Sequence, residues 1–186
     1  MAPGNLGVVP GVVMDSVASQ LLRQLEVLKV LIVDDEAGTR KVTRALLQAI
    51  GIHEFYEASD GKSGLEAIRM FEPDLVLLDW EMPSPNGPDF MRAVRSPETF
   101  PFPDVPIIML TGHSERSRVV EAVRLGVNEY LLKPVSTVAL LARIASLLRK
   151  PRRMVRQGDY YGPEPRKPNS YKPESDAGYG EVFLLN

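Results

Sequence analysis

The 186-residue sequence has no cysteine and only two histidines. These absences exclude disulfides, thiol catalysis, cysteine-ligated zinc and a histidine-rich metal site. Positive and negative residues nearly balance, with 22 Lys and Arg against 24 Asp and Glu. The chain therefore lacks the excess of basic residues that is typical of a nucleic-acid-binding protein. No apolar run approaches the roughly 18 residues that cross a bilayer. We therefore expect a cytoplasmic protein with no nucleic-acid or membrane partner, in which any metal is held by carboxylates, as suits Mg²⁺.

The two ends of the chain differ in composition from its middle. Residues 1–14 are rich in glycine, proline and valine and uncharged, which predicts a flexible lead. Apolar spacing after Asp15 predicts a short helix over residues 15–27. Residues 150–186 hold five of the 16 prolines and four of the six tyrosines but no long helical stripe. We predict that they form a tail without an effector domain, which is either disordered or, as its aromatic content favours, docks on the chain itself or on a second copy.

Between residues 28 and 149, two hydrophobic periods alternate five times. Short β-rich runs are each followed by apolar residues at helical spacing. The runs are Val30–Val33, His53–Ala58, Leu75–Leu78, Val105–Leu110 and Glu129–Leu132. This alternation predicts an α/β fold, with a parallel sheet covered by helices on both faces. Ligands of such folds bind beyond the carboxyl ends of the strands.

Chemically active side chains occur where four of these runs end. Asp34 and Asp35 follow the first run, Asp79 the third, Thr111 the fourth and Lys133 the fifth. Carboxylates gathered in a crevice repel one another unless protons or a cation compensate them, so the set favours a divalent cation. A hydroxyl and an ammonium group beside it would suit a transferring phosphoryl group. Alternatively, Asp34 and Asp35 form a solvated turn that caps the next helix.

Four segments, VLIVDDE, VLLDWEMP, IIMLTGH and YLLKPV, occur in this order. With them, residues 28–149 resemble the receiver domain of bacterial two-component response regulators. The resemblance implies a five-stranded (βα)5 flavodoxin-like sheet of order 2-1-3-4-5, here with an extra N-terminal helix and a C-terminal tail.

The resemblance also implies roles for individual residues. Asp79 is expected as the phosphoacceptor, Asp35 as a direct Mg²⁺ ligand and Asp34 as an indirect one. The backbone carbonyl of Glu81 matches the remaining protein ligand. Thr111 and Lys133 are expected to hold phosphoryl oxygens, and Tyr130 is expected to act as an aromatic switch. The resemblance also implies that the Lys133–Pro134 peptide bond is cis. Glu81 and His113 are expected to tune the lifetime of the acyl phosphate, although His113 fits a plain loop residue equally well.

The implied function is that of a stand-alone response regulator, which is not an enzyme beyond its own phosphorylation and dephosphorylation. A sensor histidine kinase is the expected donor, with a phytochrome-type kinase as one candidate. Output is expected through protein contacts, including a homodimer formed through the tail. A haloacid-dehalogenase-type phosphatase and a non-phosphorylated pseudo-receiver are the alternatives. The proline-rich loop Ser96–Pro106 is longer than most of the family has, which indicates either internal packing or a partner contact.

Overall fold

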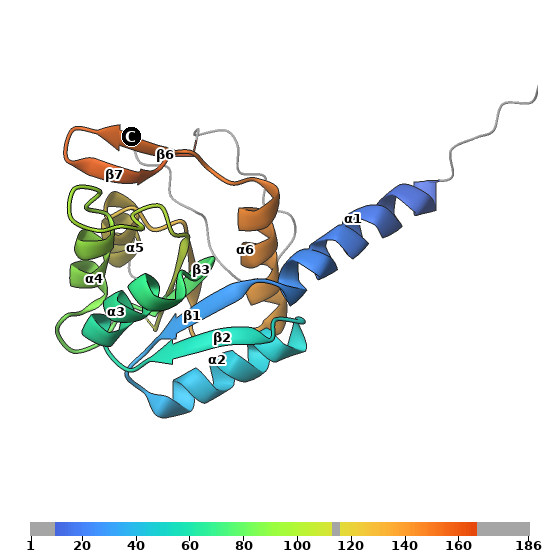
Figure 1. The fold of residues 1–186 in the computed structure, drawn as a ribbon, viewed down its shortest axis with the longest axis horizontal. Coiled ribbons are helices and arrows are strands. Elements are labelled where there is room, and N and C mark those ends of the chain that lie inside the picture. Colours follow the sequence, from blue (N-terminus) through green and yellow to red (C-terminus); the bar gives the residue numbers. More distant parts are fainter. Residues whose placement is uncertain (1–9, 113–115, 167–186) are drawn as a thin grey trace, which may run out of the picture.

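The computed structural model describes residues 10–112 and 116–166, and five parallel strands form its central sheet (Figure 1). Their order is β2-β1-β3-β4-β5, as the resemblance to receiver domains implied. The strands are β1 (Lys29–Val33), β2 (Glu54–Ala58), β3 (Leu75–Asp79), β4 (Ile107–Thr111) and β5 (Glu129–Leu132). β3 and β4 are buried throughout, because helices cover both of their faces.

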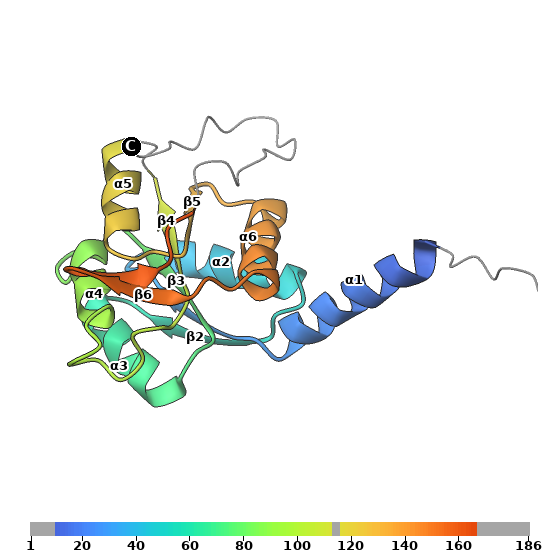
Figure 2. The same ribbon diagram turned by 90° about the horizontal axis from the view of Figure 1, so that it is seen from above.

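Helices cover both faces of the sheet (Figure 2), and one hydrophobic cluster on each face holds them to it. One face carries α2 (Ala37–Ala49) and α6 (Thr137–Arg149). The opposite face carries α3 (Gly61–Phe71), α4 (Gly87–Val94) and α5 (Arg116–Arg124). Alternate residues of the same strand therefore enter different clusters, as Leu31 and Ile32 do.

Helix α1 (Pro10–Glu26) begins five residues before the expected helix, so residues 10–14 are not part of a lead outside it. Proline suits the first turn of a helix, because the N–H that it lacks would have no partner there. The last turn is anchored by Leu25, which is 1% exposed and belongs to the cluster beneath α2 and α6. The rest of α1 extends away from the sheet (Figure 1). In the part of the chain that the structure describes, no helix is long and apolar enough to cross a bilayer.

The start of β4 also differs from the prediction, since it begins at Ile107 rather than Val105. Pro106 has no N–H to donate to a strand ladder, which explains why the ladder starts after it. At their carboxyl ends, β3 runs through Asp79 and β4 through Thr111, so these two residues are the last residues of their strands.

The described part of the tail forms an antiparallel hairpin of β6 (Met154–Gln157) and β7 (Tyr160–Pro163). Gly158 in the turn has a φ of +59°, a conformation that glycine adopts readily. Gly158 and Asp159 make a two-residue hairpin signal that the compositional interpretation of the tail overlooked. Tyr171, Tyr179 and Val182–Leu185 lie outside the described residues.

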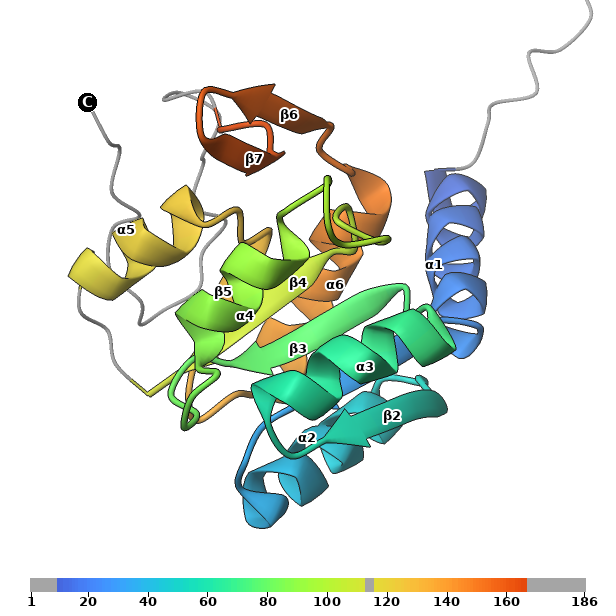
Figure 3. The ribbon, with the colours of Figure 1, turned by 60° about the vertical axis from the view of Figure 1, so that its left-hand side comes forward.

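The hairpin lies where β4 and β5 begin, at the opposite end of these strands from Asp79 (Figure 3). Four tail side chains bond to the α/β core. The pairs are Arg152 with the carbonyl oxygen of Asn128, Arg156 with Glu98, Tyr161 with Asp104, and Arg166 with Glu129. Of the two interpretations of loop 96–106, the structure therefore favours internal packing, against the chain's own tail.

A buried arginine organises the core beneath the hairpin. Arg95 donates from Nε to the carbonyl oxygen of Gly126 at 3.0 Å and from Nη2 to Oδ1 of Asn128 at 2.9 Å. The same Asn128 oxygen accepts the backbone N–H of Ile107 at 3.0 Å. Burial lowers the pKa of Arg95 to about 10, which leaves it charged at neutral pH. Arg95 thus links the end of α4 to the starts of β4 and β5.

Candidate phosphoacceptor site

Parallel topology brings three aspartates together at the carboxyl ends of β1 and β3. Asp34 and Asp35 directly follow β1, and Asp79 ends the neighbouring strand β3. One carboxylate oxygen from each lies within 4.8 Å of the other two. Asp34 and Asp79 are 1% and 4% exposed, whereas Asp35 is exposed to solvent. The aspartates form one cluster and not merely a solvated turn.

Lys133 bridges the two buried members of this cluster. Its Nζ lies 3.0 Å from Oδ2 of Asp34 and 3.1 Å from Oδ2 of Asp79. Its backbone N–H donates to the carbonyl oxygen of Thr111 at 2.8 Å, which fixes the chain where β5 ends. The Lys133–Pro134 peptide is cis, as the resemblance implied, and Ser84–Pro85 is also cis.

Burial and charge act against each other on these groups. Burial raises the pKa of Asp79 above its ordinary value, although Lys133 and the backbone N–H of Glu81 lower it in part. Burial also disfavours the charged form of Lys133, but its bonds to Asp34 and Asp79 outweigh this, and the pKa of Lys133 is raised. Lys133 is therefore held as a cation beside a carboxylate whose pKa burial raises.

The cluster fits a hard divalent cation. Three carboxylates meet here, and Lys133 supplies a single positive charge against two of them. All donors are oxygens, and the exposed Asp35 leaves one side open to water, which suits the partly hydrated coordination that Mg²⁺ prefers. Asp34, Asp35 and Asp79 each offer a carboxylate oxygen that could hold Mg²⁺ here.

Comparison with known proteins agrees with this arrangement. Residues 30–145 match the response regulator receiver domain. The chain belongs to this family. Its receiver is 31% identical over 123 residues to the chemotaxis protein CheY-3 of Vibrio cholerae, a match that covers 66% of this chain and 93% of the relative. It is 33% identical over 123 residues to the chemotaxis protein CheY of Pseudomonas aeruginosa, covering 66% of this chain and 98% of that protein.

Solved structures show the same fold. The Vibrio cholerae chemotaxis protein CheY4 has a TM-score of 0.57 at 31% identity, with 63% of this chain and 96% of that chain covered. The receiver domain of the Francisella response regulator 1452 has a TM-score of 0.59 at 27% identity, with 66% and 98% covered. These matches leave α1 and most of the tail as additions to the receiver.

Asp34 is the most constrained carboxylate of the receiver site. Its Oδ1 accepts the backbone N–H of Glu36 at 2.9 Å, while Oδ2 is occupied by Lys133. Its carbonyl oxygen accepts from Nη1 of Arg40 at 2.7 Å. Both carboxylate oxygens of Asp34 are thus bonded to the protein, as are those of Asp79, which bond the N–H of Glu81 and the ammonium group of Lys133. The indirect role of Asp34 at a metal stays a prediction.

Thr111 and Tyr130 occupy neighbouring strands beside the site. Thr111 is fully buried at the end of β4. Tyr130 is half-buried on β5, pairs in register with Met109 and packs against the cluster beneath α3, α4 and α5. His113 lies outside the described residues.

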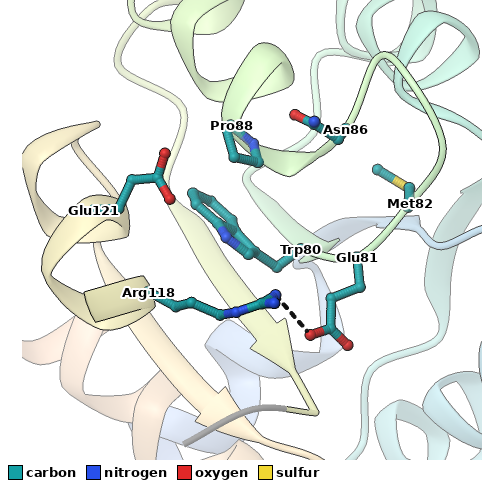
Figure 4. Close-up of a pocket in the computed structure, with 7 residues that line it drawn as sticks. All are labelled: Trp80, Glu81, Met82, Asn86, Pro88, Arg118 and Glu121. Carbon is teal, nitrogen blue, oxygen red and sulfur yellow. Dashed lines mark hydrogen bonds and ion pairs between the residues drawn. The ribbon is translucent and has the colours of Figure 1, made fainter. Parts of the chain in front are cut away.

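Glu81 has two separate attachments. Its backbone N–H donates to Oδ1 of Asp79 at 3.2 Å, while its side chain forms an ion pair with Arg118 of α5 at 3.1 Å. Arg118 was not among the residues predicted for the site, because no spacing in the sequence relates it to Glu81, 37 positions away. A groove of about 600 Å³ runs beside this pair (Figure 4).

A second groove, of about 500 Å³, opens on the other side of Lys133. It lies between α2 and the segment after β5, and its lining is largely apolar. Val42, 59% exposed, lies on the α2 side, and Pro134 and Val135 lie opposite.

Proposed function

We propose that the protein is a response regulator that accepts a phosphoryl group on Asp79 from a sensor histidine kinase in the cytoplasm. The observation that carries the proposal is the position of Lys133, within 3.1 Å of both Asp34 and Asp79 at the open end of the sheet. A phosphoryl group on Asp79 would bring further negative charge to a crevice of three carboxylates. Lys133 is the cation already in place to compensate it.

The transfer is a displacement at phosphorus. A carboxylate oxygen of Asp79 attacks, the new O–P bond forms, and the P–N bond of the donor phosphohistidine breaks with its electron pair going to the imidazole. Lys133 neutralises charge on the transferring oxygens, and Asp34 keeps its ammonium group in position. Mg²⁺, when held by Asp35, Asp79 and the backbone carbonyl of Glu81, supplies further charge compensation.

The groove beside Lys133 supports the choice of a protein donor. Its largely apolar lining includes the exposed Val42 together with Lys133 of the site. A helical phosphohistidine protein could cover this apolar surface while presenting its imidazole to Asp79.

Thr111 and Tyr130 are proposed as the switch. A hydroxyl at residue 111 can bond a phosphoryl oxygen on Asp79, and any shift of β4 changes the packing of Tyr130 on β5, because the two strands pair directly. Phosphorylation would then bias two arrangements of β5 and α5, with output through protein contacts.

The first prediction concerns labelling. With Mg²⁺ and radiolabelled acetyl phosphate, the wild-type chain takes up one phosphoryl group, and Asp79→Asn lowers labelling at least about 100-fold, since an amide is a far weaker nucleophile than a carboxylate. Asp89→Asn is the matched control, because Asp89 is an exposed carboxylate on α4 that pairs with Arg92. Labelling of Asp79→Asn at the rate of the control would refute the acceptor assignment.

The alternatives predict different outcomes. A haloacid-dehalogenase-type phosphatase would turn over small phosphoesters steadily, but its second aspartate is missing at Glu81, and the receiver family match argues against it. A pseudo-receiver would leave the wild type unlabelled. A phytochrome-type donor remains a prediction, which phosphotransfer profiling against the host's kinases tests.

A further inference from the structure

The groove in Figure 4 lies between the loop after β3 and helix α5. Trp80, which follows the acceptor and is 4% exposed, lies between Pro88 and Arg118. The Glu81–Arg118 ion pair spans the groove from the loop to the helix (Figure 4). The lining residues are Trp80, Glu81, Met82, Asn86, Pro88, Arg118 and Glu121.

This ion pair contributes little to stability. The side chains of Arg118 and Glu81 are 37% and 28% exposed, and pairs of this exposure contribute at most about 1 kcal/mol. Its effect on where the Glu81 carboxylate lies is more consequential. Oε1 is held by Arg118, and a Cβ atom placed on Gly112 would lie 3.2 Å from Oε2, so the carboxylate reaches past the end of β4.

The backbone of the same residue lies next to the acceptor, because the N–H of Glu81 bonds Oδ1 of Asp79. Without Arg118, rotation of the Glu81 side chain could bring a fourth carboxylate toward the cluster of Asp34, Asp35 and Asp79. That charge would attract a cation and repel an anionic phosphoryl donor.

We propose that Arg118 is a positioning residue that holds the Glu81 carboxylate on the α5 side of the groove and so keeps the approach to Asp79 open to an anionic donor. The inference rests on the proposed function of Asp79. For acetyl phosphate, the step forms an O–P bond to Asp79 and breaks the P–O bond to acetate, which leaves with the electron pair.

The test compares labelling by acetyl phosphate with Mg²⁺ binding, the latter followed by the fluorescence of Trp80, the single tryptophan. Arg118→Ala is expected to label about threefold to fivefold more slowly and yet to bind Mg²⁺ about threefold more tightly, as one negative charge moved closer to the cluster at a solvated site would cause. Opposite signs are the signature, since a merely loosened loop would weaken both.

Three further variants locate the effect. Adding Glu81→Gln to Arg118→Ala is expected to return both quantities to the values of Glu81→Gln alone, and Arg118→Lys is expected to stay near wild type. Arg92→Ala is the matched control: it removes the same charge from an arginine that pairs with Asp89 and Glu121 rather than with Glu81, and should change neither quantity beyond twofold.

Wild-type behaviour of Arg118→Ala in both assays, a loss of both, or an effect that persists with Glu81→Gln would overturn the proposal. Labelling of Asp79→Asn at the wild-type rate would instead overturn the proposed function. The Mg²⁺ titration of Arg118→Ala decides the role of Arg118 in either case, because it requires no phosphoryl transfer.

Discussion

The fold compensates the burial of the Asp79 carboxylate only in part. Lys133 is shared with Asp34, so it offsets only part of the cost of removing Asp79 from water, and burial raises the pKa of Asp79. Functional sites commonly retain such a cost to stability, because the same desolvated charge binds a cation and a phosphoryl group.

Asp79→Asn is therefore expected to stabilise the receiver at pH 7, by roughly 1 kcal/mol in the free energy of unfolding. The asparagine removes the buried charge and leaves Lys133 paired with Asp34. Urea unfolding without Mg²⁺ measures the difference, with Asp89→Asn, which should give no gain, as the control. A midpoint for Asp79→Asn at or below that of wild type would contradict this prediction.

The gain should also depend on pH. The folded-state pKa of Asp79 lies above its unfolded value. The free-energy cost of burying the ionised carboxylate is therefore fully present when the pH is above the folded-state pKa. This cost vanishes as the pH falls below the unfolded value, near 4. The difference in stability between Asp79→Asn and wild type should shrink from pH 7 toward pH 4. A difference that grows on acidification would show that the pKa of Asp79 is lowered instead.

The hairpin of β6 and β7 extends the packed core at the end of the receiver away from Asp79. Tail arginines bond Asn128 and Glu129, the two residues that precede Tyr130 on β5. The hairpin backbone closely approaches Gly126, where φ is +84° and a Cβ atom would lie 2.7 Å from the carbonyl oxygen of Tyr161. Only a residue without a side chain fits there.

Gly126→Ala should release the hairpin, whereas Gly158→Ala should not. Both glycines have positive φ, so both substitutions carry a backbone cost of about 1–2 kcal/mol, but a Cβ at Gly158 meets no atom within 4 Å. We expect Gly126→Ala to lose roughly 1 kcal/mol more in urea unfolding, and hydrogen exchange of β6 and β7 to accelerate in that variant. If the two variants lost the same free energy of unfolding and kept the same protection of hairpin amides from exchange, the proposed contact at Gly126 would be contradicted.

At the scale of the whole molecule, the described tail contacts its own core, through pairs such as Tyr161 with Asp104. A homodimer through the tail remains a prediction from the sequence, and the hairpin has edges through which a second chain could pair. Light scattering of the full chain and of a chain ending at Lys150, each with and without beryllofluoride, tests it. The same number of chains per particle with and without the tail would contradict the prediction.

The receiver was predictable because its signals are local or topological. Near-continuous apolar strands such as Leu75–Leu78 predict a sheet buried on both faces, and parallel strands bring their carboxyl ends to one edge, which gathers Asp35, Asp79 and Lys133. Contacts between side chains of distant elements were not predictable, as the Glu81–Arg118 pair shows. The hairpin had a local signal at Gly158, but the many prolines around it favoured an interpretation without strands.

The central claim is that Asp79 becomes an aspartyl phosphate. Borohydride reduces an aspartyl phosphate to homoserine, so the chain can be incubated with Mg²⁺ and acetyl phosphate, reduced, digested and analysed by mass spectrometry. The account predicts homoserine at position 79 and its absence when Mg²⁺ is chelated. Homoserine at Asp34 or Asp35 instead, or none at any position under conditions that phosphorylate a CheY control, would contradict it.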